Sequence, residues 1–168
     1  MYIQKKPFSH VVSMEPDKSF PFSDIPFRIL LADDDEDEHF FFEDVVTKLP
    51  FHKQVNIVEN GEKLLKYLLQ EKQVLPDVLF LDYNLPRKNG LECLLEIKRH
   101  AALKDLKVIM YSTYMHEDVA DTLYNQGALF FVRKTDSKSL EKILHKVFTH
   151  LIIKKTVRSQ RESFIITV

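Results

Sequence analysis

The sequence predicts an α/β protein with a doubly wound, five-stranded parallel sheet and five helices. Five short apolar runs recur between residues 27 and 132, and segments in which apolar residues have helical spacing separate them. The runs are continuously apolar instead of alternating, which is typical of parallel strands buried on both faces. Ligands of such sheets bind beyond the carboxyl ends of the strands, so the residues that follow each run form the candidate site.

The five runs give the strands directly. The expected strands are FRILLA (27–32), QVNIV (54–58), DVLFL (77–81), KVIMY (107–111) and ALFFV (128–132). They divide the chain into an N-terminal extension (1–26), a domain (27–152) and a C-terminal tail (153–168). The extension holds four of the seven prolines, so we expect it to be extended, either as a poorly ordered tail or as an arm that docks on a partner.

The helices follow from the apolar stripes between the strands. They are expected over about 36–49, after Gly61, from near Gly90, over about 117–126, and along a fifth stripe from Leu140 to Leu151. Gly127 follows the fourth helix at the position where glycine commonly ends a helix in a left-handed conformation.

Composition excludes several classes of protein. The formal net charge of -1 gives no basic field for nucleic acid. No apolar run approaches the roughly 20 residues that a membrane-spanning helix needs, and the N-terminus lacks the apolar core of a signal peptide. Cys93 is the single cysteine, so an internal disulfide or a cysteine zinc site is not expected. We therefore expect a cytoplasmic protein that binds neither nucleic acid nor membrane.

Polar residues follow the strands at the predicted site edge. Asp33 and Asp34 follow the first strand, Asp82 the third, Ser112 the fourth and Lys134 the fifth. Crowded carboxylates raise one another's pKa unless a cation lies between them, and Mg²⁺ prefers such oxygen ligands. With Mg²⁺ and Lys134 offsetting charge and Ser112 donating a hydrogen bond, Asp82 is predicted to attack a phosphoryl group.

Each residue alone has a plainer interpretation. The acids from Asp35 to Glu38 suit the N-cap and first turn of a helix. Ser112 alone would be read as a turn or cap residue, and Lys134 as a solvated side chain. An EF-hand is excluded, because Glu38 stands where its loop requires glycine. The joint placement after four strands favours a site.

At these residues the chain resembles the response-regulator receiver family, the CheY-like domains, and in particular their stand-alone members in Bacteroidetes and cyanobacteria. The motifs are ILLADDDEDE, LFLDYNLPRKNGLECL, VIMYSTY and GALFFVRK, within a match from about Phe27 to Leu151. The resemblance implies a flavodoxin-like strand order of 2-1-3-4-5. It also implies a phosphoprotein that catalyses its own phosphorylation and slow dephosphorylation without being an enzyme in the usual sense.

The resemblance also assigns roles to residues. It makes Asp82 the phospho-acceptor, and it makes Asp34 a direct Mg²⁺ ligand, with Asp33 acting through water and Asn84 through its backbone carbonyl. Ser112 and Phe131 become the switch residues, and Lys134 faces the phosphoryl group. The implied partners are a sensor histidine kinase or phosphotransfer protein and a downstream protein on the face of strand four, helix four and strand five.

Two residues depart from the family pattern. Lys134 is followed by Thr135, where the family usually has a proline with a cis bond. Because a cis bond to a non-proline residue costs roughly 3–4 kcal/mol, this peptide is either trans in a reshaped loop or strained. Phe131 lacks the hydroxyl of the tyrosine that is frequent at its position.

The C-terminal residues LIIKKTVRSQRESFIITV are too few for a DNA-binding domain. The final FIITV is strand-like, and it could pair with a sheet edge in this molecule or in a partner. Our hypothesis is that this tail mediates self-association into a homodimer.

Two other functions remain open. A phosphatase of the haloacid-dehalogenase type also uses Asp, Mg²⁺ and Lys, but it needs a second Asp where this chain has Asn84. A pseudo-receiver, which binds partners without being phosphorylated, would keep the same fold.

Overall fold

The computed structural model describes residues 20, 23–71, 74–114 and 116–168, and their strands form one parallel sheet in the order β2-β1-β3-β4-β5-β6. The strands are β1 (Phe27–Ala32), β2 (Lys53–Val58), β3 (Val78–Leu81), β4 (Val108–Ser112), β5 (Phe130–Arg133) and β6 (Ile165–Ile166). The helices are α1 (Glu36–Thr47), α2 (Gly61–Leu68), α3 (Gly90–Arg99), α4 (Glu117–Asn125) and α5 (Ser137–Phe148). A π-helical turn (Thr149–Ile153) continues α5.

The predicted fold class and the order of the first five strands are confirmed, but the prediction of five strands was one short. Ile165 and Ile166 in the C-terminal segment form β6, which pairs in parallel with β5 of the same chain. Of the two pairings left open for FIITV, the structure therefore contains the intramolecular one. The sequence could not decide between them, because β-branching favours an extended strand without specifying which edge it joins.

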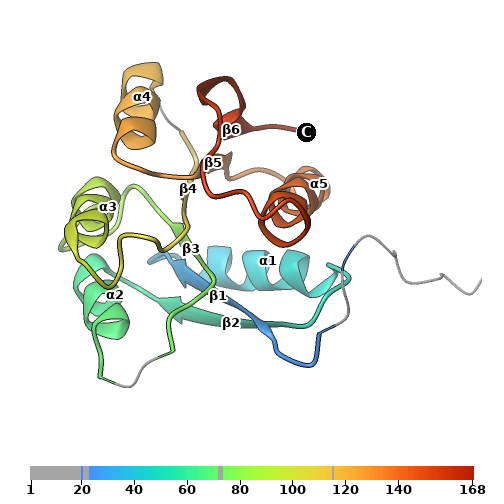
Figure 1. Cartoon of the computed structure of the whole chain (residues 1–168). Coiled ribbons are helices and arrows are strands. Elements are labelled where there is room, and N and C mark those ends of the chain that lie inside the picture. The colour runs from blue at the N-terminus through green and yellow to red at the C-terminus, as the bar shows by residue number, and fades with distance from the viewer. Residues whose placement is uncertain (1–19, 21–22, 72–73, 115) are drawn as a thin grey trace, which may run out of the picture.

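The two faces of the sheet carry separate apolar layers, and Figure 1 shows α1 and α5 on one side with α2, α3 and α4 on the other. Successive side chains of a strand point to opposite faces. Leu31 and Phe80 accordingly pack with α1 and α5, whereas Leu30 and Leu81 pack with the other three helices. Burial on both faces explains why the strands read as continuous apolar runs.

Helix ends differ slightly from prediction for local reasons. The first helix ends at Thr47 and not at Leu49, because the Lys48 N–H bonds to the carbonyl of Val45 and tightens the last turn. Gly127 has a φ of 94°, as predicted for the residue that terminates the fourth helix.

The N-terminal extension is described only at Phe20 and from residue 23 onward, and the rest of it lies outside the described residues. Phe20 is buried, and its ring packs against those of Phe51 and His145.

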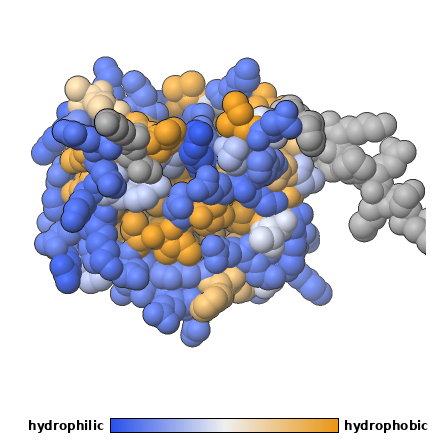
Figure 2. Space-filling model, turned by 90° about the horizontal axis from the view of Figure 1, so that it is seen from below, coloured by the Kyte–Doolittle hydropathy of each residue, from blue (hydrophilic) through white to orange (hydrophobic). Residues whose placement is uncertain are grey.

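The outer strand opposite β6 is β2. It carries half-buried Val55 and Ile57, and Figure 2 shows apolar surface ringed by polar residues on that side of the molecule. Within the described ranges, no helix has the length and apolarity to cross a bilayer.

Candidate functional site

Three carboxylates meet at the carboxyl edge of the sheet. Asp33 and Asp34 follow β1 and Asp82 follows β3, and these two strands are neighbours, with Ala32 opposite Leu81. One ligand oxygen from each carboxylate lies within 4.8 Å of the others. Asp33 and Asp82 are buried, whereas Asp34 is exposed. The gathering of acids predicted from the strand ends is therefore present.

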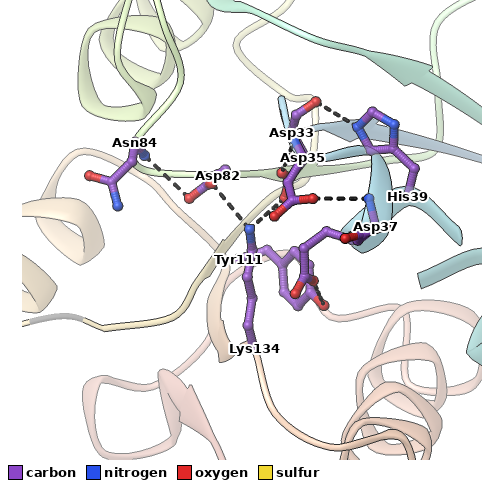
Figure 3. A network of polar contacts seen from close by, with 9 residues as sticks. Asp33, Asp35, Asp37, His39, Asp82, Asn84, Tyr111 and Lys134 are labelled. Carbon is purple, nitrogen blue, oxygen red and sulfur yellow. Dashed lines mark hydrogen bonds and ion pairs between the residues drawn. The ribbon is translucent and has the colours of Figure 1, made fainter. Parts of the chain in front are cut away.

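Lys134 bridges the two buried acids. Its Nζ lies 2.7 Å from Oδ2 of Asp33 and 3.2 Å from Oδ2 of Asp82, as Figure 3 shows. The loop after β5 brings it there, and the Lys134 N–H donates to the carbonyl of Ser112 at 3.0 Å. Of the two geometries considered for the bond to Thr135, the structure has the trans form.

Burial and charge oppose each other in this cluster. Burial raises the pKa of Asp33, although the hydrogen bond and positive charge of Lys134 act in the opposite direction. Burial would by itself lower the pKa of Lys134, but contact with Asp33 and Asp82 more than offsets it and raises that pKa. A site in which one ammonium group faces three carboxylates keeps a net negative charge and attracts a cation.

The turn into α1 fixes Asp33. The Asp35 N–H donates to Oδ1 of Asp33 at 3.1 Å, and the carboxylate of Asp35 caps α1 by accepting from the Asp37 N–H at 2.9 Å. The cap and first-turn interpretation of residues 35–38 is thus confirmed. A ring nitrogen of His39 lies 2.7 Å from the Asp33 carbonyl, a contact that our sequence reasoning missed.

The loop after β3 presents Asp82. The Asn84 N–H donates to Oδ1 of Asp82 at 3.2 Å. Gly90 opens α3 directly against Asp82, and its N–H donates to the Tyr83 carbonyl at 2.9 Å. A Cβ at residue 90 would collide with the carbonyl oxygen of Asp82, so the close approach of this helix requires glycine.

Ser112 and Phe131 lie on the neighbouring strands β4 and β5. The Ser112 side chain is fully buried, and its hydroxyl has no hydrogen-bond partner among the residues that the structure describes. A buried hydroxyl without a partner is costly, so a ligand oxygen at this site would gain a donor. Phe131 is also buried, in the apolar layer beneath α4.

Tyr111 is a second residue that the sequence did not single out. Its ring lies under the Lys134 ammonium, and its hydroxyl donates to Glu38 at 3.2 Å. Burial raises its pKa far above the usual range, so the phenol stays neutral. Within a run of strand residues, Tyr111 could not be distinguished from an ordinary core residue.

The donor set suits a hard divalent cation. Carboxylate oxygens are the ligands that Mg²⁺ and Mn²⁺ prefer, and three of them converge at this edge, where β4 ends in the buried Ser112. A cavity of about 230 Å³ adjoins the loop after β3 and is lined by Tyr83, Asn84, Tyr114, His116 and Val119. The arrangement can bind a metal ion and an anion such as a phosphoryl group.

Comparison with known proteins agrees with this chemistry. The model of the response regulator receiver domain family matches residues 29–146. The response regulator Rcp1 of Synechocystis sp. is 31% identical over 100 residues, which cover 57% of this chain and 68% of that protein. A methylesterase/glutaminase of Thermotoga maritima is 29% identical, and the alignment spans only 31% of its length.

Solved structures with the same fold include two response regulators. The Mn²⁺-bound form of Rcp1 superposes with a TM-score of 0.71 at 26% identity, covering 80% of this chain and all of that one (100%). The phosphorylated cyanobacterial phytochrome response regulator RcpA gives a TM-score of 0.68 at 27% identity, covering 79% and 97% of the two chains.

Proposed function

The chain belongs to the response-regulator receiver family and acts in two-component signalling, and from this premise we propose that Asp82 is its phospho-acceptor. The observation that carries the proposal is the contact of Lys134 with both Asp33 and Asp82 at the edge where three carboxylates gather. Asp82 is the member of this cluster that also borders the cavity-lining residues Tyr83 and Asn84. A phosphoryl group can therefore approach it from that side.

The proposed donor is a phosphohistidine on a sensor kinase or phosphotransfer protein. A carboxylate oxygen of Asp82 forms a bond to phosphorus while the bond from phosphorus to the imidazole nitrogen breaks. The electron pair stays on that nitrogen, and the ring leaves as neutral imidazole when its other nitrogen carries a proton. Lys134 offsets the charge on the transferred oxygens, and the Ser112 hydroxyl supplies a hydrogen bond to one of them.

We propose Mg²⁺ as the metal in the cell. Asp33, Asp34 and Asp82, with the backbone carbonyl of Asn84, would hold it. When bound, the ion neutralises the charge that otherwise repels a phosphoryl group from a carboxylate. Lys134 contacts both Asp33 and Asp82, so the chain itself holds these two acids together at the site.

The output is proposed to run through Ser112 and Phe131. A phosphoryl group at Asp82 would give the Ser112 hydroxyl the partner that it lacks among the described residues, and so bias β4 and β5 towards a second arrangement. The face of β4, α4 and β5 would then bind a downstream protein.

Incubation with acetyl phosphate and Mg²⁺, followed by measurement of intact mass, tests the acceptor. We expect one added phosphoryl group (~80 Da) that is absent from Asp82→Asn. Asp37→Asn is the matched control, because Asp37 is an exposed acid in the first turn of α1, near the cluster but outside it, and this variant should be modified like the unchanged protein. An adduct that persists in Asp82→Asn, or none in the unchanged protein, would contradict the proposal.

A further inference from the structure

The edge of β5 that faces away from β4 pairs with a C-terminal segment of the same chain. Phe131 pairs with Ile165 and Val132 with Ile166, and the Phe131 N–H donates to the Phe164 carbonyl at 2.8 Å. The Phe164 side chain is fully buried, in the same apolar layer as Phe131. Residues 157–168, which we call the strap, thus pair with the proposed switch residue through the backbone and place Phe164 in the same apolar layer.

The strap also contacts the helices on either side of β5, and Figure 1 shows β6 between α4 and α5. Towards α4, the Tyr124 hydroxyl donates to the Ser159 carbonyl at 3.2 Å, and Arg158 stacks on the Tyr124 ring. Arg161 forms an ion pair with Asp121 of α4. Towards α5, Lys146 donates to the Thr167 carbonyl at 2.8 Å.

The strap has less regular structure than the core strands, and its ends are exposed. β6 is only two residues long, the preceding 3₁₀ turn spans Arg161–Ser163, and both ends of the strap are exposed at Val157 and Val168. Segments with few buried contacts open at a small fraction of the free energy of global unfolding. Opening would uncover an unpaired strand edge, which is a ready template for another extended segment.

The acceptor site reaches this edge through β4 and β5. Phe131 lies opposite Met110 of β4, and Ser112 lies opposite Arg133, the residue before Lys134. A shift of Ser112 or Lys134 towards a phosphoryl group therefore moves the strand whose other edge carries the strap. Packed strands have discrete arrangements, so a small displacement at one end is transmitted.

We propose that the β5 edge and the adjoining flank of α4 are an interaction surface for an extended apolar protein segment, which the strap closes until the acceptor site is filled. The residues of the strap indicate which segment this surface would bind: one with β-branched and aromatic residues that pair with β5 and an arginine that faces Asp121. The trigger rests on the proposed function at Asp82, whereas the surface and its coupling to Ser112 do not.

Hydrogen exchange of the full chain, with and without Mg²⁺ and beryllofluoride, tests the trigger. We expect peptides that contain Phe131 or residues 160–168 to exchange about tenfold faster when the site is filled. Faster or slower exchange around Ser112 with an unchanged strap would overturn the coupling. No change around Asp82 or Ser112 would instead mean that the acceptor does not bind the analogue, which contradicts the proposed function and leaves the next experiment to decide the coupling.

Variants of the strap test the coupling in the resting protein. Phe164→Ala should accelerate exchange in the strap and also alter exchange around Ser112, whereas Ile165→Ala, at a half-exposed neighbour, should do neither. Should Phe164→Ala fail to fold, Arg161→Asp should accelerate strap exchange roughly twofold to fivefold, and adding Asp121→Arg should restore protection. A strap that opens without any change around Ser112 would refute the coupling.

The surface is tested with a labelled peptide of residues 157–168. It should bind the full-length Phe164→Ala chain, whose own strap is displaced, more tightly than the unchanged chain, where the strap competes from the same molecule. A peptide with alanine at the position of Phe164 is the control and should not bind. Equal binding of both peptides, or binding of neither, would overturn the assignment of this edge as an interaction surface.

Discussion

The Lys134 ammonium lies over the ring of Tyr111, with 5.4 Å between Nζ and the ring centroid. The ring's negative face attracts the cation, and the attraction is stronger because only 9% of the Lys134 side chain is exposed. Tyr111 thus helps to position the lysine between its two carboxylates, in a loop where Thr135 follows without the constraint of a proline.

Replacing Tyr111 with leucine should therefore slow phosphorylation by acetyl phosphate. A cation–π contact is worth about 1 kcal/mol, which corresponds to a rate roughly fivefold lower. Tyr111→Phe keeps the ring and should react at nearly the unchanged rate. Equal losses in both variants would show that the hydroxyl contact with Glu38 matters and not the ring.

Lys134→Met should destabilise the fold when metal is absent. It leaves Asp33 and Asp82 without their cation, and an uncompensated buried charge costs about 3 kcal/mol. Urea unfolding in EDTA measures the loss. Excess Mg²⁺ should restore part of the stability, because the ion replaces the missing charge. Lys138→Met, at an exposed lysine of the adjacent helix, is the control and should change little in either buffer.

Much of the site was predictable because it depends on strand ends. Continuous apolar runs located each of the first five strands to within two residues, and a parallel sheet brings their carboxyl ends to one edge. Asp33, Asp82 and Lys134 therefore lie at the same edge of the sheet. The adjacency of β1 and β3 places Asp33 beside Asp82.

What could not be predicted depends on tertiary contacts between ordinary residues. Tyr111 reads as one more apolar strand residue, and only the folded chain shows Lys134 above it. Phe164 precedes β-branched residues that favour a strand, but this pattern does not specify that its side chain is buried in the apolar layer that also holds Phe131. His39 contacts the Asp33 carbonyl because of the turn into α1, which an acidic run does not specify in detail.

Cys93 should be unreactive in the folded protein. It is fully buried on α3, and burial raises the pKa of its thiol from 9.0 to about 11. At a pH of about 8, on the order of one thiol in a thousand is ionised, and only the thiolate is nucleophilic. Iodoacetamide should label the chain in urea but hardly at all in native buffer, as intact mass would show. Rapid native labelling would place this thiol at an accessible surface.

The raised pKa of the Cys93 thiol also predicts that the free energy of unfolding depends on pH in the alkaline range. The raised pKa means that the unfolded chain loses this proton first, so the associated stability is complete below pH 9.0 and is lost as pH rises through about 11. Cys93→Ala removes the group and should give a shallower decline over that window in denaturant titrations. If stability declines equally steeply with pH in both proteins, the pKa of the Cys93 thiol is not raised by folding.

Gly90→Ala should impair both the fold and the proposed phosphorylation of Asp82. The added methyl would meet the carbonyl oxygen of Asp82 and the Cα of Tyr83, both of them backbone atoms that cannot rotate away. Overpacking of this kind costs about 1–3 kcal/mol, and the start of α3 must move to relieve it. Thermal unfolding should report the loss, and phosphorylation by acetyl phosphate should slow because Asp82 is displaced from Lys134.

At Gly127 the nearest atoms to a new Cβ belong to the flexible side chain of Lys98, although the φ of 94° would strain alanine there too. Gly127→Ala is therefore the control: it should lose stability but keep the rate of phosphorylation, so equal rate losses in both variants would refute the steric argument at Asp82.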